Sequence, residues 1–146
     1  MQRRTRWMML VLIIAALPLA ACAQKSAGAT SEKPSVVEDI EGSDFKRVVL
    51  TEKAAKRLDI QTASVREEQV DGAQRLVVPY AAVIYGLHGE TWAYANPEPL
   101  VYVRHIIDVD HIDGDLAVLF EGPPVGTAVV TVGGAELFGT ETGVSK

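Results

Sequence analysis

Short apolar runs separated by turn residues dominate the chain after residue 44. Asp71-Gly72, Gly86 to Gly89 and Asp113-Gly114 are turn signals between such runs. Strands of this length and spacing are typical of small β domains. The pattern predicts a mainly β fold, a small antiparallel barrel or sandwich of about 6–8 strands. The expected strands cover residues 48–50, 60–65, 76–78, 81–85, 91–95, 100–109, 116–120 and 127–132.

One short segment near the start of this region has helical spacing instead. Thr51 is a suitable N-cap, Glu52 lies in the first turn, and Ala54, Ala55 and Leu58 form a narrow apolar face. The sequence therefore predicts one short N-terminal helix in the β domain.

A different apolar block begins the chain. Arg3, Arg4 and Arg6 precede the unbroken apolar run Trp7 to Leu17, and the segment LAAC ends at Cys22. The run is too short to span a bilayer, which takes about 20 residues, and its layout is that of a secretory signal. Because LAAC matches the bacterial lipobox, we expect a signal peptide over residues 1–21 and a lipidated Cys22. The alternative is an ordinary cleavage site that contains a thiol.

The domain boundaries follow from composition. Ala23 to Ser43 contains no aromatic residue and mixes small, polar and acidic side chains. We expect residues 22–43 to be the lipidated cysteine with a flexible linker, residues 44–140 to be the β domain, and residues 141–146 to be a tail. The mature protein is expected to be anchored to a membrane and to face the periplasm or the cell exterior, with the inner and the outer membrane both open.

Charge and cysteine content exclude some classes of function. Loss of the signal peptide would remove three of the 14 basic residues and none of the 19 acidic ones, so the net charge would change from −5 to −8. Such an acidic protein is not suited to nucleic acid. A single cysteine excludes a disulfide within the monomer.

The candidate chemistry is sparse. His105 and His111 lie near several aspartates, but six residues of one strand would separate them by about 20 Å, too far to share an ion. The aspartate run over residues 108–115 lacks the acidic spacing of a calcium loop. Phosphate-loop and nucleophile-elbow motifs are absent from the sequence. We therefore expect no enzyme activity, no cofactor and no metal site, and we expect Trp92, Tyr94 and Tyr102 to serve in packing.

Two segments nevertheless resemble one family. LTEKAAKRLDIQTASV (Leu50 to Val65) is similar to the first segment of periplasmic adaptor subunits, or membrane fusion proteins, of RND-type efflux systems. Val77 to Leu137 is similar to the C-terminal portion of the same family. It carries V-P-x-x-A-V, an aromatic-x-Arg strand, and a G-L-x-x-G-x-x-V-V-x-x-G motif with Pro123 in place of Leu. Asp59 stands where that family favours Gly.

The resemblance implies a fold and a role. In the family the two segments come together as the membrane-proximal β domain, and the helical hairpin, lipoyl domain and β-barrel are inserted between them. Here only Arg66 to Arg75 occupies that place. The resemblance thus implies an adaptor reduced to its membrane-proximal module. A decayed adaptor without a present role is a further reading of the same truncation.

Two functional hypotheses follow. The first is a lipid-anchored, non-enzymatic docking or accessory module that binds an efflux transporter or a full-length adaptor through strand edges and loops such as Gly86 to Gly89. The rival is a periplasmic small-ligand or metal-binding lipoprotein that uses His88, His105 or His111. The stretch FEGPPVGTAVVTVGG (Phe120 to Gly134) is expected to form corners between strands, and not to lie before a helix.

Overall fold

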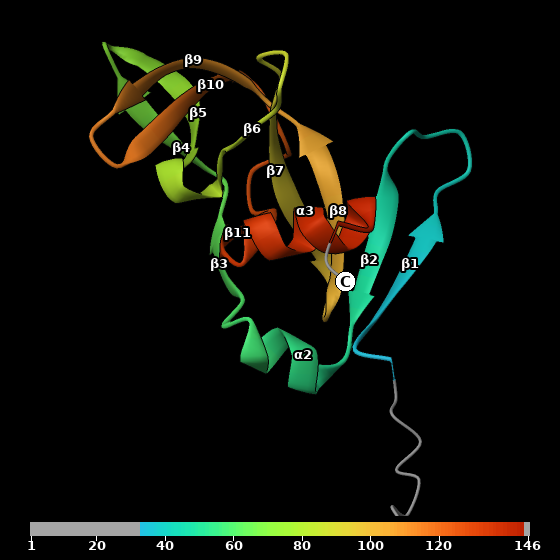
Figure 1. The fold of residues 1–146 in the computed structure, drawn as a ribbon. Helices are drawn as coiled ribbons and strands as arrows, with labels where there is room; N and C mark the ends of the chain where they lie inside the picture. Colours follow the sequence, from blue (N-terminus) through green and yellow to red (C-terminus); the bar gives the residue numbers. More distant parts are fainter. Residues whose placement is uncertain (1–32, 145–146) are drawn as a thin grey trace, which may run out of the picture. The chain divides into compact units, whose positions relative to one another are not determined.

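The computed structural model describes residues 33–144, which form a mainly β domain with two α-helices (Figure 1). The elements follow the chain in the order β1 (Ser35–Asp39), β2 (Lys46–Leu50), α2 (Glu52–Arg57), β3 (Gln61–Ser64), β4 (Arg66–Val70), β5 (Ala73–Pro79), the 3₁₀-helix η1 (Tyr80–Ala82), β6 (Ile84–Tyr85), β7 (Thr91–Glu98), β8 (Val101–Ile106), β9 (Asp108–Asp113), β10 (Leu116–Glu121), β11 (Ala128–Val132) and α3 (Gly134–Thr142).

The strands form two antiparallel sheets. The seven-stranded sheet has the order β1-β2-β8-β7-β11-β3, with β6 paired to β7. The four-stranded sheet has the order β4-β5-β10-β9. The predicted mainly β, antiparallel fold is confirmed, and its form is two sheets with open edges among the described residues and not a closed barrel.

The described residues contain eleven strands, more than the expected 6–8. One reason is that the strand expected over Leu100 to Val109 changes sheets at Ile107. That residue is buried, and its N–H donates to Thr91 O over 3.1 Å, while β8 and β9 on either side belong to different sheets. The sequence has no glycine or proline at this change of sheet, and Ile107 and Val109 both pack in the core cluster that the two sheets share.

The predicted short helix is confirmed as α2. Thr51 caps it by accepting a hydrogen bond from Ala54 N over 3.2 Å. The chain leaves the helix through Asp59, whose φ of +50° lies in the left-handed region. Aspartate visits that region more readily than most residues, so it serves where the family resemblance favours glycine.

Two boundary predictions were wrong in the part of the chain that the structure describes. Residues 35–39, expected in the linker, form β1, which pairs with β2 from Ser35↔Leu50 to Asp39↔Lys46. Glu141 and Thr142, expected in the tail, belong to α3. The stretch that ends in Gly133-Gly134 therefore precedes a helix, although its Gly122–Gly126 part forms a corner as predicted, closed by a hydrogen bond from Thr127 N to Pro124 O.

Two apolar clusters form the core. The first joins residues of both sheets, including Val65, Val78, Ala93 and Leu119. The second lies where α2 and α3 pack on the larger sheet and includes Leu50, Ala54, Tyr94, Tyr102 and Leu137. Pro123 is buried, so the residue that departs from the family motif is accommodated within the packed protein. Neither helix in residues 33–144 is long and apolar enough to cross a membrane.

Candidate functional site

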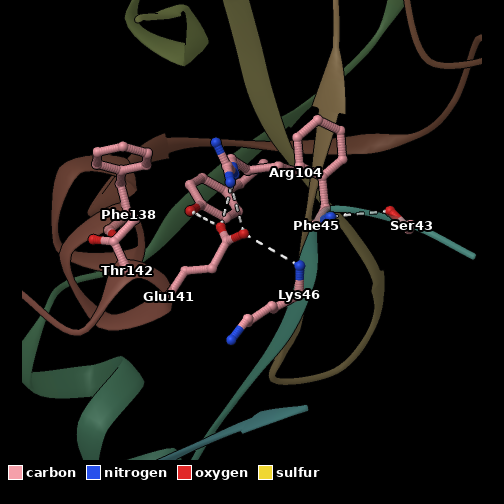
Figure 2. A network of polar contacts seen from close by, with 8 residues as sticks. Ser43, Phe45, Lys46, Arg104, Phe138, Glu141 and Thr142 are labelled. Atoms are coloured by element: carbon pink, nitrogen blue, oxygen red, sulfur yellow. Dashed lines mark hydrogen bonds and ion pairs between the residues drawn. The ribbon is translucent and has the colours of Figure 1, made fainter. Parts of the chain in front are cut away.

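Buried charge gathers where α3 packs against the larger sheet (Figure 2). Glu141, on the last turn of α3, has a side chain that is 2% exposed, and Arg104 on β8 has one that is 12% exposed. Arg104 Nη2 donates to Glu141 Oε1 over 2.9 Å. Arg104 Nε lies 2.8 Å from Glu141 Oε2 as an ion-pair contact, but its N–H is not aligned for a hydrogen bond.

Two further donors complete the surroundings of this carboxylate. Tyr94 on β7 donates its hydroxyl to Glu141 Oε2 over 2.5 Å, and Lys46 N at the start of β2 donates to Oε1 over 3.2 Å. Burial, followed by the hydrogen bond to Glu141, raises the pKa of the Tyr94 phenol well above its ordinary value. The phenol therefore stays protonated and remains a donor at neutral pH.

Aromatic rings surround the Arg104 guanidinium. Its Cζ lies 4.6 Å from the ring centroid of Phe45, 4.9 Å from that of Trp92 and 5.3 Å from that of Phe138. Trp92 and Phe138 also stack on each other, with centroids 5.9 Å apart. Ring faces attract a cation, so this cage stabilises the charge that Glu141 balances.

We name the residues Phe45, Trp92, Tyr94, Arg104, Phe138 and Glu141 the arginine cluster. Its charges compensate each other inside the domain, and they connect β2, β7, β8 and α3. The arrangement is that of a structural clamp that holds the C-terminal helix on the sheet, because the two buried charges balance each other and leave no net charge for a substrate.

Exposed apolar side chains gather elsewhere, around the loop between β6 and β7. Leu87 is 98% exposed, Tyr85 is 55% exposed and Tyr80 is 44% exposed. The rings of Tyr80 and Tyr85 meet edge to face with centroids 6.5 Å apart. We name Tyr80, Tyr85 and Leu87 the β6–β7 tip. An apolar side chain as exposed as Leu87, two residues after the end of β6 and its half-exposed Tyr85, is a feature of binding surfaces.

The loop that carries this tip has internal hydrogen bonds. Gly86 N donates to Glu90 O over 2.8 Å, and His88 N donates to Glu90 Oε2 over 2.8 Å. The pKa of the Glu90 carboxyl is lowered, chiefly by a hydrogen bond from the backbone N–H of Glu90 itself. Burial opposes this effect, and the hydrogen bond from the backbone N–H of His88 adds to it. The ionised carboxylate thus stabilises the loop through hydrogen bonds, and Leu87 belongs to an ordered turn.

The structure does not bring the three histidines together as a site. His88 lies in the β6–β7 loop, His105 near the end of β8 and His111 on β9. His105 Nδ1 lies 2.7 Å from Ile106 O, and His111 Nδ1 lies 3.3 Å from the Asp110 carboxylate. Within residues 33–144, no group of three or more His, Cys, Asp or Glu side chains is placed to hold a metal ion.

Sequence reasoning located some of these residues and missed others. Trp92, Tyr94 and Tyr102 are buried as expected, and the Gly86–Gly89 loop joins β6 to β7 as predicted. Cys22 lies outside the described residues. The Arg104–Glu141 pair was missed. The sequence did contain a sign of the helix, because Leu137 and Glu141 are four residues apart and would lie on the same face of a helix that begins after Gly133.

Comparisons with known proteins give one structural likeness. No protein-family model and no curated protein matches the chain. A solved NMR structure of the N-terminal metal-binding site and membrane proximal domain of SilB from Cupriavidus metallidurans CH34 matches with a TM-score of 0.46 and 23% sequence identity. The match covers 64% of this chain and 53% of the SilB chain, so this protein spans about half the length of that one.

Proposed function

We propose that this chain is a lipid-anchored, non-enzymatic, adaptor-like module of an RND-type efflux system that docks to a transporter or to a full-length adaptor. The observation that carries the proposal is the way its two family-like segments assemble. β3, from the first segment, pairs with β11, from the second, over Ala128↔Ser64 to Val132↔Gln61. This is the assembly that the resemblance implies for a membrane-proximal domain.

The site of the missing insertion supports the same proposal. β4 and β5 pair from Arg66↔Val77 to Val70↔Ala73, and a turn at Asp71-Gly72 joins them. Both turn residues have positive φ, +52° and +81°, as a tight hairpin requires. A closed hairpin therefore occupies the place where the family carries its other domains, and the four-stranded sheet forms without them.

The β6–β7 tip is the surface through which we propose docking. Its apolar side chains are exposed at an ordered turn, and the domain offers them without unfolding any element. An aromatic pair and an exposed leucine suit an apolar pocket on a folded protein, since aromatic anchors are enriched among the residues that dominate the binding energy of interfaces. No catalytic arrangement is required for this role.

The tip predicts the result of a co-purification from detergent-solubilised membranes. Leu87→Asp places a charge on a side chain that is 98% exposed, so the fold is expected to be unaffected. Recovery of the transporter or full-length adaptor is expected to fall about tenfold or more, which corresponds to a loss of at least about 1.4 kcal/mol of binding energy. The matched control is Val144→Asp, which makes the same charge change at an exposed residue near the C-terminus. Equal recovery with both variants contradicts docking through the tip.

Anchoring has its own prediction. Cys22→Ser is expected to leave the precursor unlipidated and to move the protein out of the detergent-rich phase in phase partitioning, because two or three acyl chains give stable anchoring. Wild-type chain and a variant at Ser26, which also lies outside the described residues, serve as controls. Unchanged partitioning of Cys22→Ser contradicts lipidation at this residue.

A further inference from the structure

Within residues 33–144 five strands have an unpaired edge, and β6, at two residues, is the shortest of them; the others are β1, β3, β4 and β9. β4 and β9 are strongly charged: REEQV and DVDHID. Charged edges discourage a further strand from pairing. β3 is four residues long, and β4 follows it after Val65. β1 differs, because Val36 is 50% exposed and Val37 is 38% exposed. It lies beyond β2 at the edge of its sheet, as Figure 1 shows at the right.

The hydrogen-bond pattern shows which β1 groups point outward. Thr51 N donates to Pro34 O over 3.0 Å, so the pair Pro34–Thr51 is a hydrogen-bonded pair between β1 and β2. Bonded and non-bonded pairs alternate along an antiparallel ladder. Val36 and Glu38 therefore direct their N–H and C=O groups toward β2, and the backbone groups of Ser35, Val37 and Asp39 point away from the sheet.

We propose that a second copy of this chain pairs antiparallel with β1, with Val37 on the two-fold axis. In this register only backbone groups that point away from the sheet form hydrogen bonds between the copies. Val37 pairs with Val37 of the second copy, and Ser35 pairs with Asp39 of the second copy. Three bonded pairs of this kind supply six hydrogen bonds. No other centre within β1 aligns all three outward residues of one copy with all three of the other.

The side chains agree with this register. Ser35 lies opposite a carboxylate of the second copy, Asp39, to which its hydroxyl can donate a hydrogen bond, and Val36 lies opposite Glu38. Like charges directly opposite each other destabilise strand pairs, and this register places no two like charges opposite each other. Glu38 and Asp39 are also balanced within their own copy, by Arg47 at 3.7 Å and Lys46 at 3.5 Å. Past the strand ends, the register directs Lys33 toward Glu41 of the second copy.

This pairing goes beyond the proposed function and does not depend on it. The β6–β7 tip lies on η1, on β6 and in the loop that follows β6, and β8 and β2 separate β7 from β1 in the sheet. Two copies joined through β1 therefore each keep a tip for an efflux partner. Confinement of the copies to one membrane would raise their effective concentration for each other.

Cross-linking in membranes tests the register. Two Val37 Cα atoms facing across a bonded pair are about 5.5 Å apart, within the range that a disulfide bridges. Val37→Cys in the otherwise wild-type full chain is expected to give several-fold more covalent dimer under mild oxidation than Val144→Cys, although Val144 is the more exposed residue, 79% against 38% for Val37. The wild-type chain reports any dimer formed through Cys22. Equal dimer from the two cysteine variants overturns the proposal.

A proline pair tests the same edge without a cysteine. Val37→Pro removes an outward N–H and is expected to convert the detergent-purified chain from a mass of two copies to a mass of one, with the melting temperature lowered only by the loss of the second copy and no longer dependent on protein concentration. Val36→Pro removes an N–H that bonds β2, so it is expected to lower the melting temperature. A wild-type chain that is monomeric, or a Val37→Pro chain that stays dimeric, overturns the pairing through β1. Because neither measurement uses an efflux partner, failure here leaves the proposed function standing.

Discussion

Glu141→Ala is expected to lower the free energy of unfolding by about 3–5 kcal/mol, because it leaves Arg104 buried without its counter-charge. It also removes the acceptor of the Tyr94 hydroxyl, which is buried with its ring. Urea unfolding followed by tryptophan fluorescence is a suitable measurement, since Trp92 stacks on Phe138 of the helix that Glu141 holds. A smaller loss, about 1–3 kcal/mol, is expected for Glu141→Gln, which keeps an acceptor and loses the charge.

Glu136→Ala is the matched control for this prediction. Glu136 lies on the same helix but is exposed in its first turn, where the favourable effect of a carboxylate is about 0.3–1 kcal/mol. A double variant, Arg104→Met with Glu141→Leu, is expected to lose less than the sum of its single variants, since it removes both charges together. If Glu141→Ala and Glu136→Ala unfold at the same urea concentration, the arginine cluster is not a clamp.

Gly133→Ala is expected to be the second strongly destabilising change, by about 2–4 kcal/mol. Gly133 caps α3 with φ of +89° and ψ of 6°, in the left-handed region, where an L-residue with a Cβ is strained. A Cβ there would also collide with Ile60 Cδ1 and would lie 3.4 Å from Leu58 O. Urea unfolding gives the loss directly.

Gly126→Ala separates the two causes. Gly126 has almost the same φ, +87°, but a Cβ on it would meet no atom within 4 Å. Its loss should therefore be the conformational part alone, about 1–2 kcal/mol. The excess for Gly133→Ala measures the packing of the β11–α3 turn against the end of α2. Equal losses for the two variants would falsify the claim that this glycine is required by close contact as well as by conformation.

Local chemistry in the sequence predicted much of the fold. Residue type determines some features without long-range information: Thr51 as an N-cap, and Asp71-Gly72 and Asp113-Gly114 as turns. The burial of Tyr94 and Tyr102 agrees with the packing role expected of aromatic residues on the predicted strands. These elements depend on side chains close in sequence, which is why the pattern was sufficient.

The missed features depend on contacts between distant residues. β1 is polar and acidic apart from two valines, and its order comes from pairing with β2 and from the Arg47 and Lys46 contacts. α3 contains Gly134 and Gly139 and has no basic residue in its last turn, so its own helix propensity is low. Glu141 holds it through residues 37 to 95 positions away. Composition cannot reveal such partners.

We propose that the β6–β7 tip contacts an efflux component in the membrane. A photo-cross-linking amino acid at position 87, in the full chain expressed in its own cells, tests this most directly, because Leu87 is 98% exposed and the replacement leaves the packing of the domain intact. The same amino acid at position 144 is the control. We expect adducts with an RND-type transporter or a full-length adaptor from position 87 and none from position 144. Adducts with neither class from position 87, in membranes that contain both, would contradict the proposal.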